Sequence, residues 1–510
     1  MTMPDDNNEN AVTQPKLAEL RAAAARLHFE LSDDELEMYA GFMEGMVGDF
    51  NLIDSLEAPK LPVKYPRDAG YRPEAGENPL NAWCWKASIK GAASGKLAGK
   101  KLVVKDNIGV AGIPMTNGSK VFEGFIPDED ATVVTRVLDA GGEILGKAVC
   151  ENFCFSGGSH TSATGPVLNP HNPDFMTGGS SSGCAALIVA GECDMAIGGD
   201  QGGSIRMPSS FSGCYGIKPS YGLVPYTGAC PIEQSVDHLG PMAGNSADCA
   251  LLLEVLAGYD DGLDPRQPAN LQPKPYVSAL EKGADGLRLG IVKQGFATPL
   301  SEPDVDEMVR EAAHRMEKAG AVVEEVSIPM HVQAASITLT SMLDGTLSTF
   351  TDQGTNGPNP KGHNVMEAIR FFQKARKKRA ADFPVTVKTV LLFAQVMRER
   401  YGNYYSAKAQ NLIRNVRAAY EKAFTHYDIL VLPTTVMKAH RIPPSDAPAE
   451  IIWTLALDMI GNTAPFDGTG HPSMSVPAGM SNGLPVGMMF TGRYGEDDVV
   501  LRTGHAFEKI

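Results

Sequence analysis

The order of hydrophobic and polar residues divides the chain into a helical beginning and a longer mixed part. Residues 15–28 have a helical pattern, and the capping box Ser32–Glu35 opens a second helix that runs to about Asp49. A Pro-rich stretch from Pro59 to Pro79 follows. This pattern predicts a small helical N-terminal module before the larger part of the chain.

Beyond Leu97, short β-type runs alternate with Gly-rich turns and helices. Such alternation predicts a mixed or parallel sheet covered by helices. The expected strands lie in LVVKDNI, EILGKAV, LRLGIV, VVEEVSI, DILVLPTT and SMSVPAG, with helices over 131–140 and 304–319. We expect a helical module over 1–70 and a catalytic domain over 71–510, with a mostly helical, substrate-specific stretch at about 332–427.

Composition and charge narrow the class of function. The 510 residues are 43% hydrophobic, carry a formal net charge of −15 and have a sequence pI of about 5.3. An acidic chain is poorly suited to bind nucleic acid or anionic membrane, and the sequence has neither a signal peptide nor an apolar run of ~18 residues. The eight cysteines are scattered as in reduced proteins. We expect a cytoplasmic protein that acts on a small molecule, without nucleic-acid or membrane partners.

The segment Gly178–Pro225 carries most of the candidate chemistry, because its glycines and serines cluster around one apolar helix and one short strand. Glycine turns let backbone approach a ligand closely. Consecutive N–H groups of Gln201, Gly202, Gly203 and Ser204 are candidates for an oxyanion hole, beside Ser204 as candidate nucleophile. A single GGS is usually only a turn, so the interpretation depends on the whole segment.

The motifs GGSSSG, DQGGSIRMP and GIKPSYGLVP, in this order, resemble the amidase signature family. Ser180 and Ser204 are separated by 204 − 180 = 24 positions, as in that family. Further matches are VVKDNI, TNGS, NPHNP, LPTT, GHPSMSVPAG and GLPVG. The resemblance implies an α/β/α sandwich around a large mixed sheet. It also implies hydrolysis of a carboxamide to a carboxylate and ammonia through a seryl acyl-enzyme, without metal or cofactor.

The same resemblance assigns roles to three residues. Ser204 is the nucleophile, Ser180 is the bridging serine after a cis peptide bond from Gly179, and Lys105 is the base. A hydroxyl both donates and accepts, so Ser180 can pass a proton from Ser204 to Lys105. A lysine at the ordinary pKa of about 10.4 is charged at neutral pH, but burial favours its neutral form. The apolar LVV before Lys105 predicts a core strand, whereas Asp106 would favour the charged form if it lay close.

Four further residues are expected to support this loop: Gly178, Gly179, Asp200 and Arg206. We interpret Asp200 and Arg206 as a structural ion pair, since Arg is suited to fixed bidentate pairing. The sequence departs from the family pattern at Ser182, commonly Gly, and at Gln201, commonly Thr or Ile. Catalysis should tolerate Gln201 because that residue would contribute only its backbone N–H.

A narrower similarity concerns DQGGSIR, the N-terminal module and AWCWKASIKG, which resemble the bacterial enantioselective amidases associated with nitrile degradation. It implies a small monoamide substrate and a homodimer, with residues 1–70 as the dimerisation element.

Three alternatives remain. One is the glutaminase subunit of a tRNA-dependent amidotransferase. Another is an α/β-hydrolase-type esterase, because GSSSG fits a nucleophile elbow with Ser181 as nucleophile and His238 or His471 as base. Cys150, Cys154 and His160 also resemble a weak metal motif, but buried structural cysteine is the favoured interpretation.

Overall fold

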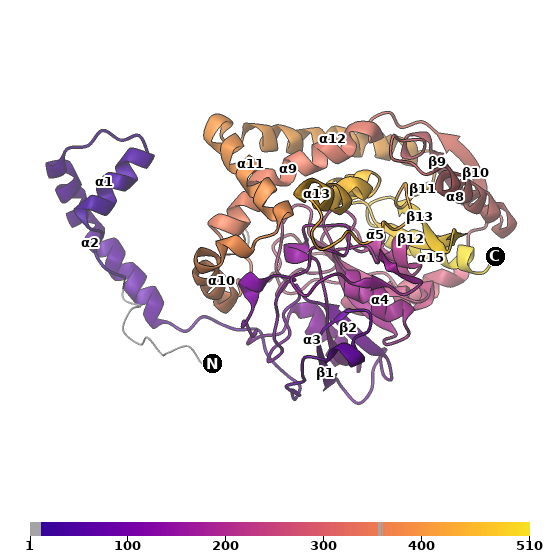
Figure 1. Ribbon diagram of the computed structural model, residues 1–510, viewed down its shortest axis with the longest axis horizontal. Helices are drawn as coiled ribbons and strands as arrows, with labels where there is room; N and C mark the ends of the chain where they lie inside the picture. The colour runs from indigo at the N-terminus through magenta and orange to yellow at the C-terminus, as the bar shows by residue number, and fades with distance from the viewer. Residues whose placement is uncertain (1–11, 355–358, 360) are drawn as a thin grey trace. The chain divides into compact units, whose positions relative to one another are not determined.

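The chain folds into two units that meet in sequence at Leu61 and Pro62. The computed structural model describes residues 12–354, 359 and 361–510. In the N-terminal unit, α1 (Leu17–Arg26) and α2 (Asp33–Ser55) form a helical hairpin (Figure 1). The expected capping box is present, since Ser32 and Glu35 exchange hydrogen bonds. Helix α2 ends at Ser55 rather than at Asp49, because no proline interrupts the chain between Asp49 and Pro59.

The second unit is built on an 11-stranded mixed sheet with the order β1-β3-β2-β6-β8-β7-β12-β13-β11-β9-β10. Parallel pairs occur toward both sides of the sheet, and antiparallel pairs form its middle. The strands are β1 (Trp83–Lys90), β2 (Lys101–Lys105), β3 (Glu143–Ala148), β6 (Met195–Asp200), β7 (Tyr215–Lys218), β8 (His238–Ala243), β9 (Arg288–Val292), β10 (Val322–Val326), β11 (Ile429–Pro433), β12 (Ser473–Ser481) and β13 (Leu484–Gly492). Strands β4 (Leu168–Asn169) and β5 (Asn172–Met176) form a separate hairpin.

The inner strands of the sheet are buried on both faces, which explains why β6, β11 and β13 are nearly all apolar. In β2, Leu102 and Val104 pack into one core cluster, and Val103 packs into another. The same alternation separates Val431 from Leu430 in β11. Side chains alternate between the faces of a strand, so each of these two strands contributes to the hydrophobic core on both faces of the sheet.

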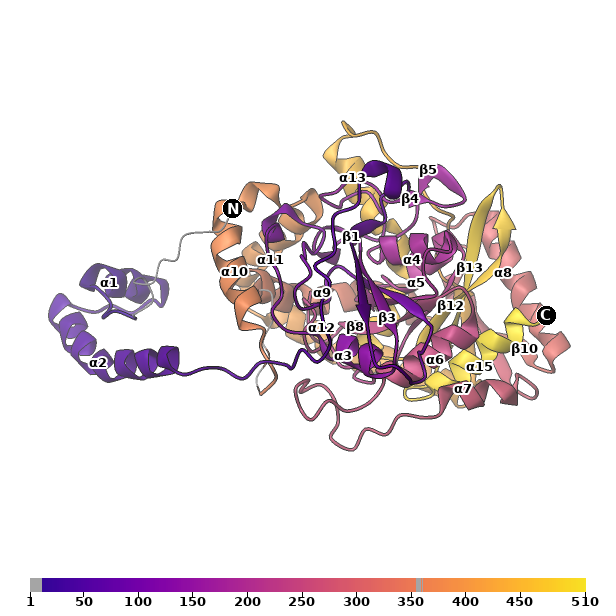
Figure 2. The ribbon, with the colours of Figure 1, turned by 90° about the horizontal axis from the view of Figure 1, so that it is seen from below.

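Helices cover the two faces and make three layers (Figure 2). The expected α/β/α sandwich around a large mixed sheet is confirmed. One face carries α3 (Thr132–Asp139), α6 (Ser246–Leu256), α7 (Tyr276–Ala279), α8 (Pro303–Arg315) and α15 (Asp497–Glu508). The other carries α4 (Ser182–Val189), α5 (Arg206–Ser212), α12 (Tyr404–Phe424) and α14 (Ala464–Thr469).

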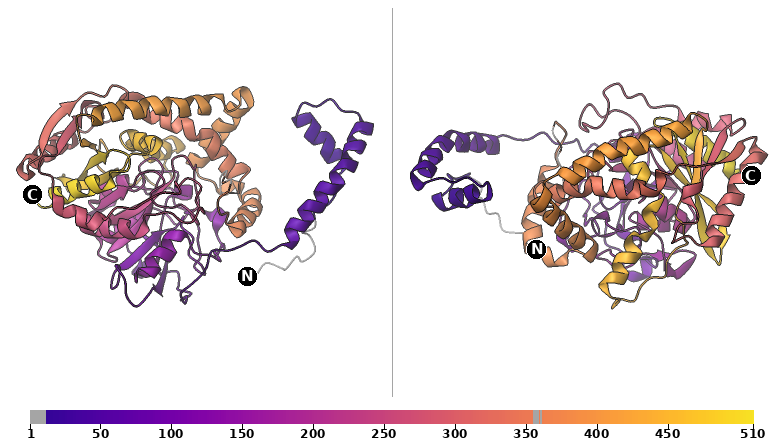
Figure 3. Two further views of the ribbon diagram at one scale, coloured as in Figure 1. Left: turned by 180° about the vertical axis from the view of Figure 1, so that it is seen from behind. Right: turned by 90° about the horizontal axis from the view of Figure 1, so that it is seen from above.

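Long helices form a group at one side of this unit, in salmon and orange in Figure 3. They are α9 (His331–Thr351), α10 (Met366–Lys378), α11 (Val385–Tyr401) and α12. Helix α9 packs against α11 and α12. The stretch expected to be mostly helical is therefore helical, and its residues 355–358 and 360 lie outside the described residues. A further helix, α13 (Ala449–Leu457), contacts α11. Across the described ranges, no helix has the length and apolar character needed to cross a membrane.

Candidate active site

Lys105 is the last residue of β2, a strand that lies between β3 and β6 inside the sheet. Its side chain is completely buried, as the apolar residues before it predict. Lys105 Nζ donates hydrogen bonds to Ser180 Oγ at 2.7 Å and to the carbonyl of Gly199 at 3.0 Å. The buried amine is thereby held against one of the two candidate serines.

The neighbouring Asp106 forms an ion pair with a second buried lysine, Lys147 in β3. Lys147 Nζ lies 3.3 Å from Asp106 Oδ1, and both side chains are fully buried. The other carboxylate oxygen accepts hydrogen bonds from the N–H and hydroxyl of Thr116 at 2.9 and 2.6 Å. Asp106 therefore already has a cationic partner other than Lys105. The parallel pairing of β2 and β3, in which Lys147 lies opposite Val104, brings this lysine to Asp106.

Glycines bring the turn before α4 close to the rest of the core. The peptide bond between Gly179 and Ser180 is cis, as the family resemblance implies. A Cβ atom on Gly179 would lie 2.2 Å from the carbonyl oxygen of Gly158. Gly178 has φ +75°, and a Cβ there would lie 2.9 Å from Cα of Pro208. Only glycine fits both positions without displacing backbone.

Three consecutive serines in this turn point to different partners. Ser180 Oγ accepts from Lys105, whereas Ser181 Oγ donates to the carbonyl of Gly199 at 3.1 Å and accepts from its N–H at 3.3 Å. Ser182 Oγ donates to the carbonyl of Val149 at 3.3 Å. The hydroxyl of Ser181 is thus tied to the backbone of β6.

Ser204 lies in the turn between β6 and α5. The Ser204 carbonyl accepts the Ser181 N–H at 3.2 Å, so the two serine-bearing turns are joined. Ser204 Oγ makes no hydrogen bond within the described residues, and the side chain lines a cavity. Gly203 has φ +133°, and a Cβ there would lie 2.2 Å from Thr463 Oγ1. The turn therefore requires glycine immediately before Ser204.

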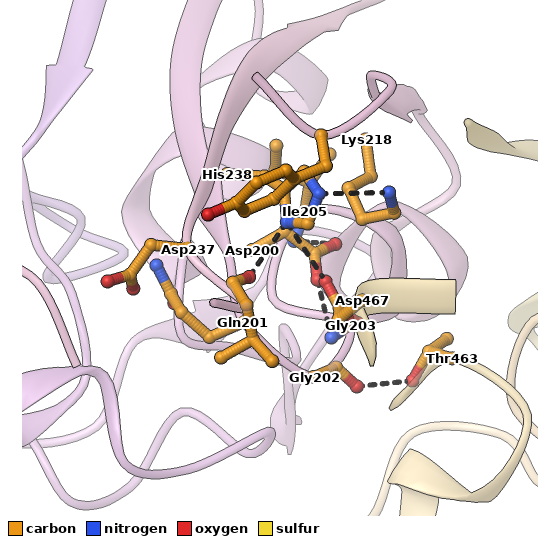
Figure 4. Close-up of polar contacts among 12 residues, drawn as sticks. Asp200, Gln201, Gly202, Gly203, Ile205, Lys218, Asp237, His238, Thr463 and Asp467 are labelled. Carbon is orange, nitrogen blue, oxygen red and sulfur yellow. Dashed lines mark hydrogen bonds and ion pairs between the residues drawn. The ribbon is translucent and has the colours of Figure 1, made fainter. Parts of the chain in front are cut away.

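A buried ion-pair network centred on Arg206 anchors this turn. Figure 4 shows two of its members, Asp200 and Asp467, near Gly203. Arg206 Nε and Nη2 each donate to one oxygen of Asp200 at 3.0 Å, so the expected structural ion pair is present and bidentate. Arg206 also donates to Asp467 at 2.6 Å and to the carbonyl of Thr463 at 2.9 Å. Thr463 Oγ1 donates to the Gly202 carbonyl at 2.6 Å. Contacts from the C-terminal part of the chain thus fix the turn.

Burial and the neighbouring charges shift the pKa values of the groups in this network. Burial acts to raise the pKa of Asp200, but the adjacent charge of Arg206 outweighs it and holds that pKa below its usual value. Burial, together with the charge of Asp200, raises the pKa of Asp467 well above its usual value. Burial lowers the pKa of Lys218 to about 8 and that of His238 well below its usual value. Of the two carboxyl groups in the network, Asp200 is therefore the one that more strongly stays ionised.

The backbone N–H groups of the turn differ in availability. Gly203 N–H donates to Asp200 Oδ1 at 2.6 Å. Within the described residues, the N–H groups of Gln201, Gly202 and Ser204 make no hydrogen bond. The Gln201 side chain donates to the hydroxyl of Tyr226 at 2.9 Å, so it supplies only its backbone to the turn. Three of the four candidate oxyanion donors are unoccupied, and the fourth is engaged.

The cavity beside Ser204 has a volume of about 690 Å³. Its walls come from α9, α11 and α13 together with the turns at Cys154 and Ser204. The apolar lining residues are Phe155, Met207, Ile232, Leu300, Leu339, Met342, Leu343, Val390, Phe393, Trp453, Leu457 and Ile460. Asp458 is the one charged side chain among the described lining residues, and His440 Nε2 lies 3.0 Å from it. Sequence reasoning missed Trp453 and Leu457, which lie beyond the stretch 332–427.

The family of the chain follows from comparison with known proteins. A family model described as Amidase matches residues 80–501. The chain belongs to the amidase signature family. It is therefore an amidase that hydrolyses carboxylic amides, and its small-molecule substrates are amides.

Named relatives of this amidase include two kinds of enzyme. An enantioselective amidase of Rhodococcus rhodochrous is 42% identical over 98% of this chain and 96% of that protein. A component of the glutamyl-tRNA(Gln) amidotransferase of Methanosarcina mazei is 37% identical over 81% of this chain and 85% of that protein. The solved peptide amidase of Stenotrophomonas maltophilia is 31% identical, with a TM-score of 0.66, and covers 81% of this chain and 83% of its own.

The described residues of this amidase do not have the geometry that an esterase with Ser181 as nucleophile or a metal site would need. His238 bonds to the Val236 carbonyl at 2.7 Å, and His471 bonds to Thr469 Oγ1 at 2.8 Å; neither bonds to Ser181. In the described part of the chain, no three His, Cys, Asp or Glu side chains are grouped to bind a metal ion. All eight cysteines lie within that part, buried and without disulfides.

Proposed function

We propose that Ser204 attacks the amide carbonyl, that Ser180 relays its proton and that Lys105 accepts it. The observation that carries this proposal is the 2.7 Å hydrogen bond between the buried Lys105 Nζ and Ser180 Oγ, next to a cavity that Ser204 lines. A serine hydroxyl needs an adjacent base to become a good nucleophile. The relay then runs backward to protonate the leaving ammonia.

The oxyanion of the tetrahedral intermediate would be held by N–H groups of Gln201, Gly202 and Ser204. Their lack of other partners among the described residues supports this role, because preorganised donors stabilise charge that develops in the transition state. Gly203 N–H, the fourth donor expected from the sequence, instead holds the turn to Asp200. Gly178, Gly179, Asp200 and Arg206 shape the loops and touch no reacting atom in this scheme.

The cavity favours amides with a bulky, uncharged acyl group. Its apolar walls can bury an aryl or branched alkyl substituent, worth roughly 25 cal/mol for each Å² removed from water. The only charged side chain among the described lining residues, Asp458, already has His440 as partner. A free amino acid such as glutamine would leave its α-ammonium and α-carboxylate unpaired there, which is costly. This disfavours the amidotransferase alternative, although an amidotransferase component is a relative.

We also propose that the N-terminal unit forms a homodimer contact, as part of the module expected over 1–70. Helix α2 exposes apolar side chains at helical spacing, each more than two fifths accessible: Met38, Phe42, Met46, Phe50 and Ile53. Residues three and four apart share one helix face, so these side chains form a stripe. A second copy of the same stripe would cover it.

Two further expectations remain proposals. The amide substrate would arise by hydration of a nitrile, as the resemblance of DQGGSIR and AWCWKASIKG to nitrile-associated amidases implies. The cytoplasmic location also stays a prediction; it agrees with eight cysteines that form no disulfide in the described residues.

The test is ammonia release from acetamide, benzamide, 2-phenylpropionamide and glutamine, compared between wild type and Ser204→Ala. We expect rapid release from the aryl and branched amides, slow release from glutamine and none with Ser204→Ala. Release from glutamine alone would transfer the protein to the glutaminase class. Unchanged release by Ser204→Ala would exclude the proposed nucleophile.

A further inference from the structure

Cys150 and Cys154 meet beside Lys105, the base of the proposed relay. Cys150 follows β3, and Cys154 ends the turn Asn152–Cys154, where Phe153 and Cys154 have φ values of 51° and 62°. Both Sγ atoms share one acceptor, Asn117 Oδ1, at 3.8 and 3.6 Å. The two thiols also interact directly with each other. The turn therefore brings together two sulfur atoms that are four positions apart.

Only one of the two thiols faces the substrate cavity. Cys154 lines that cavity together with Ser204, whereas Cys150 is fully buried behind it and does not. The Cys154 side chain also interacts with Ser180 and Lys105. A small reagent that enters the cavity thus reaches Cys154 first, at the residues of the proposed proton relay.

The surroundings favour a reactive thiolate at Cys154. Burial acts to raise the pKa of this thiol, but the hydrogen bond with Cys150 and the charge of Lys105 outweigh it and lower the pKa. Burial and the same hydrogen bond raise the pKa of Cys150 well above its usual value. The thiolate is the nucleophilic form of cysteine, and a neighbouring lysine is a known cause of such activation.

We propose that Cys154 is an oxidation site inside the substrate cavity and that Cys150 resolves it to a disulfide, which reversibly switches off the enzyme. The oxidant is a peroxide small enough to enter the cavity, such as hydrogen peroxide. The other cysteines are buried and do not line this cavity.

The chemistry balances in two steps. The Cys154 thiolate attacks one peroxide oxygen, the O–O bond breaks, and hydroxide leaves and takes up the proton that the Cys154 thiol has given up, which makes water. Cys154 is then a sulfenic acid. The sulfur of Cys150 attacks that sulfenic sulfur, its thiol proton joins the departing hydroxide, and a second water leaves. Two thiols have lost two electrons in all, and the peroxide has gained them.

Oxidation should disable the enzyme because it rearranges the cavity wall beside the relay residues Ser180 and Lys105. A disulfide requires the sulfur atoms to approach to about 2 Å, so the Cys154 sulfur must leave its present position among Cys150, Ser180 and Lys105. Phe155 and Ser156, which directly follow Cys154, also form part of the cavity wall. This step rests on the proposed function of Lys105 and Ser180, whereas disulfide formation itself does not.

The experiment treats the full chain with hydrogen peroxide and follows intact mass, peptide mapping and amide hydrolysis, each normalised to the untreated variant. We expect wild type to lose the mass of two hydrogen atoms, to show a Cys150–Cys154 linkage and to lose activity in step. Dithiothreitol should restore both. In Cys154→Ser, inactivation should slow by an order of magnitude or more. The matched control Cys193→Ser, a buried cysteine outside the cavity, should behave as wild type.

A second variant keeps the proposal testable if Cys154→Ser folds poorly. In Cys150→Ser, peroxide should leave a sulfenic acid on Cys154 that dimedone traps, with no disulfide. Absence of the Cys150–Cys154 linkage in oxidised wild type, or equal inactivation of Cys154→Ser and wild type, would overturn the proposal. Full activity in protein that carries the Cys150–Cys154 disulfide would contradict the claim that this disulfide switches off the enzyme. Since the mass measurement needs no activity, failure of the proposed relay would be recognised separately.

Discussion

Replacement of Arg206 by methionine tests how the catalytic turn is held. The guanidinium is fully buried and connects Asp200, Asp467 and the Thr463 carbonyl. Methionine fills much of the same space but donates no hydrogen bond. Asp467 can then take up a proton, because its pKa is already raised, whereas Asp200 loses its main counter-charge.

The expected cost to folding is large. Removal of one partner from a buried ion pair costs about 3–5 kcal/mol, and protonation of Asp467 places this case near the lower end. A loss of about 3 kcal/mol lowers the folding equilibrium constant by roughly two orders of magnitude. Activity should fall as well, because Asp200 fixes Gly203 beside the oxyanion donors. Loss of one such donor lowers kcat by about 10²–10³, which bounds the effect from above.

Urea unfolding followed by tryptophan fluorescence, together with kcat on benzamide, measures both effects. The matched control is Arg441→Met, which removes an arginine whose side chain is 69% exposed and 3.1 Å from Asp174. Surface pairs contribute at most about 1 kcal/mol, so this variant should unfold and react nearly as wild type does. Equal midpoints and equal kcat for the two variants would refute the anchoring role of Arg206.

Other expected outcomes follow from the same site. Lys105→Ala should nearly abolish hydrolysis, whereas Ser180→Ala should retain a small rate; equal, mild losses in kinetic assays would contradict their roles. Met342→Trp should reduce kcat/KM for 2-phenylpropionamide more than for acetamide, because Met342 lines the cavity. In wild type, the contribution of Asp200 to the free energy of unfolding should be lost as pH falls below about 4, because the folded-state pKa of Asp200 is lowered. Asp200→Asn should not show that loss when unfolding is measured against pH. Removal of residues 1–61 should give a monomer by sedimentation, and a persistent dimer would reject the α2 contact.

Local patterns predicted the frame of the site because they depend on short stretches of chain. The apolar run LVV in β2 placed Lys105 at the inner end of a core strand. The glycine pattern placed two serine-bearing turns at either side of α4 and β6. The ion pair of Asp200 and Arg206 also lies within one turn. Each of these features follows from residues close in sequence.

Long-range contacts could not be predicted in the same way. Arg206 and Asp467 are 261 positions apart, and nothing in either local pattern pairs them. The cavity wall combines α9, α11 and α13, so Trp453 became a candidate only in three dimensions. Lys147 was missed because a lysine near a strand end is usually exposed, whereas this one neutralises Asp106 inside the core.

The most direct test of the account is to trap the acyl-enzyme and locate it. Wild type quenched in acid during turnover of 2-phenylpropionamide, or of its hydroxamate, should gain the mass of one acyl group on the peptide that contains Ser204. Ser181→Ala should still form this adduct, and Ser204→Ala should not. An acyl group mapped to Ser181, or an adduct that persists in Ser204→Ala, would contradict the central claim.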